Sequence, residues 1–133
     1  MNILVTGGVS GLGEAITKRL AESSENKVYF TFRKSDGNAK QIEIGFANAK
    51  AIKCDFSDER EVSSLVEYIS AMDLDVLVNN AYNGDFLKVH FQKINISEFE
   101  TDLRVNILPT IAITQSAIKV FRKKKSGKIV TIL

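Results

Sequence analysis

The sequence predicts an α/β protein built on a doubly wound parallel sheet with helices on both faces. Three observations support this fold class: five short strand-like segments, helical periodicity between them, and a glycine-rich turn directly after the first segment. Strands that alternate with helices need crossover connections, which place helices on both faces of a parallel sheet. The length of 133 residues fits one domain over residues 1–133.

The strand-like segments are short, mostly apolar and bounded by polar residues or glycine, as buried parallel strands are. They cover residues 3–6, 27–32, 51–54, 75–79 and 128–133. The expected order across the sheet is 3-2-1-4-5. Taken literally as the last strand, the fifth segment would form an exposed apolar edge, which favours pairing with other chains or aggregation.

Helical patterns follow the first and third strands. Apolar residues recur with the 3.6-residue period over residues 12–20 and again over residues 62–69. Asp58 with Glu61 resembles a capping box before the second pattern, and Ser57 is the alternative cap.

A third helical segment is longer and ends before the fifth strand. A capping box at residues 97–100 (Ser-Glu-Phe-Glu) is expected to open it, and Gly127 is expected to stop it. Pro109 lies inside it, where the missing N–H and the ring predict a bend close to Asn106. The basic run 122–125 is interpreted as cations that face the negative end of the helix dipole.

Composition and charge exclude several classes of function. The chain has 18 Lys and Arg against 16 Asp and Glu, a formal charge of +2, so nucleic acid is not an expected partner. One cysteine excludes an internal disulfide, and one histidine argues against a zinc hydrolase or a Ser/His/Asp triad, so no metal site is predicted. No apolar run reaches the ~20 residues of a membrane span, and no signal-like segment opens the chain. We therefore expect a cytoplasmic protein without membrane contact.

The strongest functional signal is the turn at residues 6–13 (Thr-Gly-Gly-Val-Ser-Gly-Leu-Gly). It joins an apolar strand to an apolar-periodic helix, the context that a dinucleotide loop requires. Gly7 is expected to allow the tight turn, Gly11 to let a pyrophosphate approach the backbone, and Gly13 to let the helix pack closely. The helix N-terminus then offers N–H groups to phosphate. The turn predicts a Rossmann-type nucleotide site that includes Thr6, Gly7, Val9, Ser10, Gly11, Leu12 and Gly13.

The spacing G-x-x-x-G-x-G, with the preceding threonine, resembles the nucleotide loop of the short-chain dehydrogenase/reductase family. Three further sites match the family in the expected order: Asp55 after the third strand, Asn79-Asn80-Ala81 at the end of the fourth, and Asn106 in the long helix. Within the family the sequence looks most like carbonyl reductases of the 3-oxoacyl-acyl-carrier-protein type.

The resemblance implies roles for these residues. Asp55 would hydrogen-bond the adenine amino group, and Asn106 would belong to the family's catalytic set of Asn, Ser, Tyr and Lys, as the anchor of a water relay. Tyr82 departs from the family motif Asn-Asn-Ala-Gly, where it adds bulk near the expected nicotinamide ribose and costs strain if the backbone needs a positive φ. The implied cofactor site extends over Asp55, Phe56, Asn79, Asn80, Ala81 and Tyr82.

The end of the second strand indicates which nicotinamide cofactor is preferred. An acidic residue there binds the ribose hydroxyls of NAD, whereas a basic residue favours the extra phosphate of NADP. Arg33, Lys34 and Ser35 stand at this point, with Asp36 as a possible competitor. The planar guanidinium of Arg33 suits a phosphate, so the sequence predicts NADP, with NAD less favoured.

The rest of the family's catalytic set lies outside the sequence. Each tyrosine lacks a lysine four residues later, since Arg33 follows Tyr29, Met72 follows Tyr68 and Phe86 follows Tyr82. The family serine falls just past the fifth strand. We therefore expect residues 1–133 to be the NAD(P)-binding part of a longer reductase, without the later strands and inactive alone.

Two functions stay open at this point. The first is hydride transfer between NADPH and a small carbonyl or alcohol substrate, in a complete protein that forms a homodimer or homotetramer as the family commonly does. The alternative is a non-catalytic dinucleotide-binding or redox-sensing module. A methyltransferase is disfavoured because Phe32-Arg33 supplies no acidic ribose partner, and a P-loop is excluded because no Lys-Ser/Thr follows Gly13.

Overall fold

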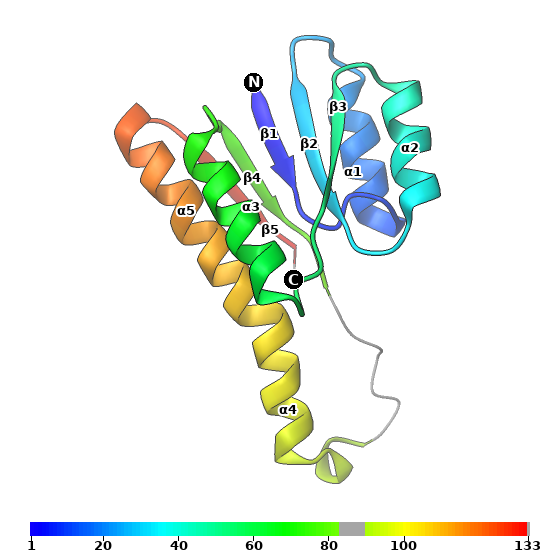
Figure 1. The fold of residues 1–133 in the computed structure, drawn as a ribbon, viewed down its shortest axis with the longest axis vertical. Helices are drawn as coiled ribbons and strands as arrows, with labels where there is room; N and C mark the ends of the chain where they lie inside the picture. The colour runs from blue at the N-terminus through cyan, green and yellow to red at the C-terminus, as the bar shows by residue number, and fades with distance from the viewer. Residues whose placement is uncertain (83–89, 133) are drawn as a thin grey trace.

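The computed structural model describes residues 1–82 and 90–132, except for the side chain of Phe91. Strands and helices alternate along the chain, as Figure 1 shows. The elements are β1 (Asn2–Val5), α1 (Gly11–Ala21), β2 (Lys27–Phe32), α2 (Asp36–Gly45), β3 (Ala49–Lys53), α3 (Glu59–Ala71), β4 (Val76–Asn79), η1 (Phe91–Lys93), α4 (Ile96–Asp102), η2 (Leu103–Ile107), α5 (Leu108–Lys124) and β5 (Lys128–Thr131).

The five strands form one parallel sheet in the order β3-β2-β1-β4-β5, which confirms the predicted topology. Helices α1 and α2 cover one face of the sheet, and α3 and α5 cover the other (Figure 1). The chain winds outward from β1 in one direction and then returns to continue from β4. The direction of winding therefore reverses between β1 and β4, where open α/β sheets bind their ligands.

Two apolar layers hold the helices to the sheet. Successive side chains of a strand point to opposite faces, and β1 shows this in Ile3, Leu4 and Val5. Leu4 packs in the layer under α3 and α5, while Ile3 and Val5 pack in the layer under α1 and α2. All three residues are buried, so a central strand stabilises both layers at once.

The predicted elements are largely confirmed, and two local predictions are wrong. Asp58 caps α3, since its side chain accepts hydrogen bonds from the backbone of Arg60 and Glu61. The box that opens α4 is formed by Asn95 and Glu98 instead of by residues 97–100. Asn95 is the N-cap residue and has an extended backbone, so its side chain can reach the backbone N–H of Glu98, the third residue of the helix.

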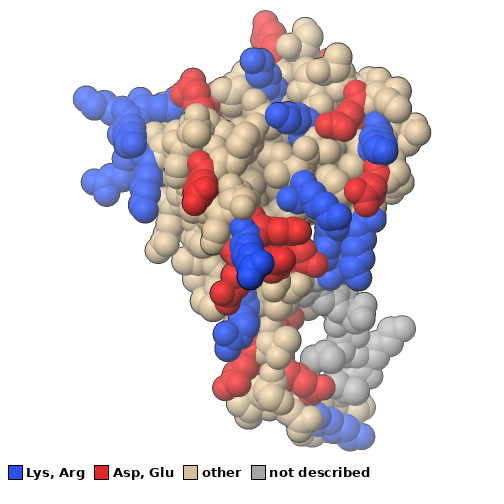
Figure 2. All heavy atoms as spheres, in the orientation of Figure 1, with Lys and Arg blue, Asp and Glu red and all other residues tan. Residues whose placement is uncertain are grey.

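The end of α5 also differs from the prediction. Lys125 ends the helix in the left-handed conformation, with φ of 56°, two residues before Gly127. Gly127 is needed for another reason, because a Cβ there would lie 2.0 Å from Cγ of Phe121. The basic residues of the last turn, Arg122 to Lys124, lie at this end of α5, and Figure 2 shows the cluster of positive side chains there.

A wide helical turn precedes Pro109. The sequence predicts a bend at this proline; the structure has a π-helical turn, η2, between α4 and α5, with Pro109 in the first turn of α5. α4 and η2 continue the line of α5 and extend past the carboxyl ends of the strands (Figure 1). Such π-helical turns are often found at functional sites, and this one contains Asn106.

β5 lies at one edge of the sheet, and all four of its residues are exposed. Ile129 and Val130 are exposed by 41% and 47%, so the predicted apolar edge is confirmed for the residues described. Across residues 1–82 and 90–132, no helix combines the length and the apolar character that a membrane span requires.

Candidate cofactor site

A pocket of about 360 Å³ opens at the carboxyl ends of β1, β2 and β4, where the winding of the sheet reverses. Four separate segments meet around it: the glycine turn and the segments at or just after the ends of β2, β3 and β4. Its lining consists of Gly7, Val9, Ser10, Leu12, Gly13, Thr31, Phe32, Arg33, Lys34, Ser35, Cys54, Phe56, Asn80, Ala81 and Tyr82.

Thr6 locks the glycine turn to the end of β4. Its buried hydroxyl accepts hydrogen bonds from the backbone N–H groups of Asn80 and Ala81, both at 3.0 Å. In return, Nδ2 of Asn80 donates to the carbonyl oxygens of Thr6 and Gly7, at 3.0 and 3.1 Å. These bonds satisfy buried polar groups and fix the two walls of the pocket relative to each other.

The glycine turn is shaped by close contacts. Gly7 has φ of +67°, and its N–H donates to Oγ1 of Thr31 at 2.9 Å, which ties the turn to β2. A Cβ on Gly13 would lie 2.1 Å from the carbonyl oxygen of Gly7 and 2.4 Å from Nδ2 of Asn80. Gly13 therefore lets α1 begin directly against the turn, as the sequence predicts.

The N-terminus of α1 faces this pocket through Ser10, Leu12 and Gly13. Ser10 is the N-cap, and among the residues described its side chain makes no capping hydrogen bond. Gly11 has φ of +52°, and no described atom lies within 4 Å of the place where its Cβ would be. Backbone N–H groups at a helix N-terminus with space in front of them suit an anionic group such as a diphosphate.

Two basic side chains stand at the end of β2. Arg33 and Lys34 are exposed and line the pocket together with Ser35. Their charges act on Asp55. Partial burial raises the pKa of this carboxyl, but the hydrogen bonds from Ser57 and the charges of Arg33 and Lys34 together outweigh that effect. The pKa of Asp55 therefore lies below the ordinary value. This end of the pocket therefore carries positive charge that suits a phosphate.

Tyr82 lines the pocket beside the end of β4. Its hydroxyl donates a hydrogen bond of 3.3 Å to Oδ1 of Asp102, and burial followed by the charge of Asp102 raises the pKa of the phenol. The same Oδ1 accepts a 3.0 Å bond from Nδ2 of Asn106. Tyr82 does not have a positive φ, so the backbone strain considered for this position is absent. In the part of the chain that the structure describes, the non-glycine residue with positive φ is Lys125.

The predicted site residues fall into two groups. Those that line the pocket are Gly7, Val9, Ser10, Leu12, Gly13, Arg33, Lys34, Ser35, Phe56, Asn80, Ala81 and Tyr82. Those outside its lining are Thr6, Gly11, Asp55, Asn79 and Asn106. Thr6 supports the pocket walls through the hydrogen bonds that its hydroxyl accepts from Asn80 and Ala81.

Asn79 and Asn106 are both buried, at 6% exposure each. Nδ2 of Asn79 donates to Oγ1 of Thr114 at 3.0 Å, and its Oδ1 has no hydrogen-bond partner among the residues described. Asn106 lies in η2, and its carbonyl oxygen accepts a 2.7 Å bond from Oγ1 of Thr110. Asn79 therefore connects β4 to α5, and Asn106 connects η2 to the first turn of α5.

The sequence analysis did not predict four residues of the site. Thr31, Phe32 and Cys54 line the pocket because they lie at or just after the ends of β2 and β3, and these strand ends are visible in the sequence. Burial, followed by the charges of Glu61, Asp55 and Asp58, raises the pKa of Cys54 to about 12, so its thiol stays protonated. Asp102 gave no signal, since its contact with Tyr82 spans 20 positions in the chain.

Comparisons with known proteins agree with this geometry. The sequence model of the family described as short chain dehydrogenase matches residues 1–133. The chain is 33% identical over 98% of its length to a 3-amino-tetrahydro-pyrrolizinone reductase from Xenorhabdus hominickii, of which it covers 44%. It is 31% identical over 97% of its length to a 3-oxoacyl-acyl-carrier-protein reductase from Aquifex aeolicus, of which it covers 53%. The predicted likeness to reductases of this type is confirmed.

Solved structures give the same result. A short-chain dehydrogenase from Burkholderia cenocepacia, solved in complex with NADP, has a TM-score of 0.76 at 32% identity and matches 97% of this chain and 53% of its own. A short chain dehydrogenase/reductase family protein has a TM-score of 0.84 at 26% identity and matches 98% of this chain and 54% of its own. The chain thus spans about half the length of the relatives it matches. On the family match, the fold and the glycine turn, the chain belongs to the short-chain dehydrogenase family.

Proposed function

We propose that the chain binds NADP(H) in this pocket and serves as the cofactor-binding part of an oxidoreductase that transfers hydride between NADPH and a carbonyl or alcohol substrate. One observation carries the proposal: the glycine turn, the basic end of β2 and the Asn80-Ala81 segment line a single pocket. A nicotinamide cofactor supplies the hydride, so the protein contributes binding, orientation and electrostatics.

Each part of the pocket suits one part of the nucleotide. The N-terminus of α1, from Ser10 to Gly13, would bind the diphosphate through backbone N–H groups and the positive end of the helix dipole. Arg33 and Lys34 would bind the phosphate that distinguishes NADP from NAD. Asp55, beside these two charges, would contribute to the adenosine end. The nicotinamide half would then extend toward Ala81 and Tyr82.

The activity of the whole protein is part of the same proposal. The family serine and Tyr-x-x-x-Lys would come from sequence beyond residues 1–133, as would most of the substrate pocket and any contacts of a homodimer or homotetramer. Asn106 would anchor a water relay, supported by its burial in a π-helical turn next to Pro109. The NADP complex of the Burkholderia cenocepacia relative supports the choice of cofactor. The cytoplasmic location stays a prediction.

Calorimetry tests the cofactor site directly. Titration of the chain with NADPH and with NADH should show binding of both and a lower Kd for NADPH. Absence of binding to either nucleotide, in protein whose circular dichroism shows the folded α/β structure, would refute the proposal. A complete protein that carries the serine and Tyr-x-x-x-Lys should reduce carbonyl compounds with NADPH and lose most of this activity in Asn106→Ala. Nucleotide binding without turnover in that complete protein would favour a sensing module instead.

A further inference from the structure

One carboxylate oxygen joins the pocket wall to the π-helical turn. Oδ1 of Asp102 accepts hydrogen bonds from the hydroxyl of Tyr82 at 3.3 Å and from Nδ2 of Asn106 at 3.0 Å. Asp102 is the last residue of α4, and Asn106 lies one turn later in η2. Tyr82 approaches from the end of β4, so the contact connects two elements that are distant in sequence.

The position of Tyr82 places it at one end of the pocket. Arg33 and Lys34 line the end beside β2, whereas Tyr82 follows Ala81 at the end beside β4, with the glycine turn between them. A dinucleotide whose diphosphate lies on the glycine turn and whose adenosine phosphate lies at Arg33 therefore has its other half beside Tyr82. Tyr82 is 59% exposed, so it is available to a ligand there.

We infer that Tyr82 is a specificity-determining residue for the nicotinamide riboside half of the nucleotide, and that Asp102 is the positioning residue that holds its ring. This inference rests on the proposed function and adds to it a pair of residues that contributes to binding of the nicotinamide riboside half. An exposed aromatic ring with a free hydroxyl would rotate, and a ligand would have to order it on binding. The bond to Asp102 restricts the ring beforehand, which removes part of that cost.

The shared oxygen also links Tyr82 to the catalytic candidate. Asn106 is buried, and Oδ1 of Asp102 is an acceptor for its amide. Loss of the carboxylate removes this acceptor from both the phenol and the amide, whereas loss of the phenol hydroxyl removes only the contact of Tyr82. Asn in place of Asp keeps an acceptor oxygen at the same position, so Asp102→Asn is the conservative variant.

The test compares two probes by calorimetry: NADP⁺, and adenosine 2′,5′-bisphosphate, which lacks the nicotinamide riboside and the phosphate attached to it. Tyr82→Phe and Asp102→Ala should each raise the Kd for NADP⁺ by about 3- to 10-fold, the effect of one lost hydrogen bond. The Kd for the bisphosphate should change by less than about twofold. Asp102→Asn should stay closer to the wild type than Asp102→Ala, and the double variant Tyr82→Phe/Asp102→Ala should bind NADP⁺ no more weakly than the poorer single variant.

Tyr68→Phe is the matched control, because it removes a phenol hydroxyl on α3 away from the pocket lining. Its affinity for both probes should equal that of the wild type. Unchanged NADP⁺ binding in Tyr82→Phe and Asp102→Ala would overturn the inference, and so would equal weakening of both probes. Failure of the proposed function has a different signature, since the wild type itself would then bind neither probe.

Discussion

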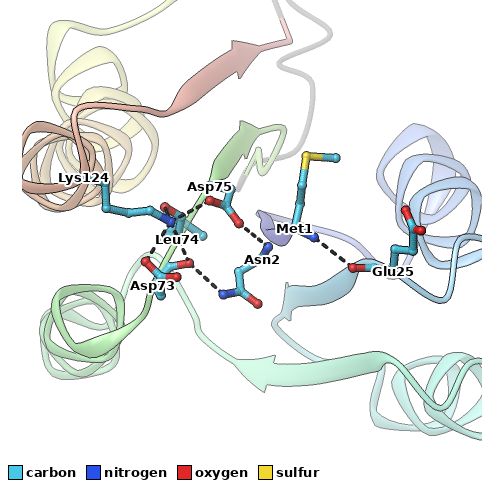
Figure 3. A network of polar contacts seen from close by, with 7 residues as sticks. All are labelled: Met1, Asn2, Glu25, Asp73, Leu74, Asp75 and Lys124. Carbon is cyan, nitrogen blue, oxygen red and sulfur yellow. Dashed lines mark hydrogen bonds and ion pairs between the residues drawn. The ribbon is translucent and has the colours of Figure 1, made fainter.

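Lys124 and Asp75 form an ion pair in which Nζ lies 2.6 Å from Oδ1, at the amino ends of β1 and β4 (Figure 3). Nζ also pairs with Oδ1 of Asp73 at 2.7 Å and donates to the carbonyl oxygen of Leu74 at 3.2 Å. The second oxygen of Asp75 accepts a 2.7 Å bond from the backbone N–H of Asn2. The last turn of α5 is thereby joined to the start of β1 and β4, at the end of these strands opposite the pocket.

Replacement of Asp75 by Asn should lower stability in a pH-dependent way. Hydrogen bonds from Lys124 and from the backbone of Asn2 lower the pKa of Asp75, so its contribution is complete above the unfolded pKa of about 3.9 and is lost as the pH falls through the folded value. Thermal unfolding at pH 7 should show Tm lower by about 2 to 5 °C in Asp75→Asn, with a difference that narrows below pH 4.

Glu67→Gln on α3 is the control for this experiment, because it removes an exposed carboxylate from a helix surface. Its Tm should lie within about 1 °C of the wild type at pH 7. A Tm difference for Asp75→Asn that stays constant from pH 7 to pH 3 would contradict the role of the charge.

Replacement of Arg33 by Ala should remove the preference between the two cofactors. A charge-assisted contact to the extra phosphate is worth roughly 1.5 to 3 kcal/mol, which corresponds to about 10- to 100-fold in Kd. Calorimetry should therefore show weaker NADPH binding in Arg33→Ala and an NADH affinity close to that of the wild type. Arg122→Ala, at the far end of α5, is the matched control and should change neither Kd. Equal weakening of both cofactors would contradict a specific phosphate contact.

Most of the fold could be predicted because it depends on local patterns. The apolar strand segments and the turn at Gly7 to Gly13 carry periodicity and backbone requirements that are visible in the sequence. Helix α2 gave no such signal, since its buried residues are Ala39 and Ile42 and it contains glycines at both ends. Its helical form therefore depends on packing against the sheet, which overrides a weak local preference.

The candidate site shows the same division. The lining by Arg33 and Asn80 could be predicted because each follows directly on a strand, and parallel strands end at one edge of the sheet. The contact between Tyr82 and Asp102 could not, since it depends on where α4 lies relative to β4. The ion pair of Lys124 and Asp75 spans 49 positions and was equally invisible; the sequence indicated only cations at a helix end.

Cys54 should resist thiol reagents in the native protein. Burial and the nearby carboxylates raise its pKa to about 12, so about one thiol in 10,000 is ionised at pH 8. Reaction with an aromatic disulfide at pH 8 should be negligible for the folded chain and should reach one equivalent in guanidinium chloride. Rapid labelling of the native protein, at the rate seen in denaturant, would show that the thiol is exposed.

The raised pKa of Cys54 also predicts that the protein becomes less stable at high pH. Because the pKa in the folded chain lies above that in the unfolded chain, the contribution of the protonated thiol to the free energy of unfolding is complete below about pH 9. This contribution is lost as the pH rises toward 12. Urea unfolding of Cys54→Ala and of the wild type should therefore show a stability difference that shrinks between pH 8 and pH 11. A difference that is constant over this range would contradict the raised pKa.

Replacement of Gly13 by Ala should damage both the fold and the nucleotide site. The added Cβ would meet the backbone oxygen of Gly7 at 2.1 Å, and backbone at the start of α1 cannot yield without moving the turn. We expect urea unfolding to show a loss of about 1 to 3 kcal/mol, and calorimetry to show NADPH binding at least tenfold weaker. Gly37→Ala in α2 is the matched control, because no atom of the described residues lies within 4 Å of its Cβ position. It should keep the wild-type Kd and gain about 0.5 kcal/mol from helix propensity. Equal stability and affinity in the two variants would mean that the turn has room to adjust, and that a close approach of α1 is not what shapes the phosphate site.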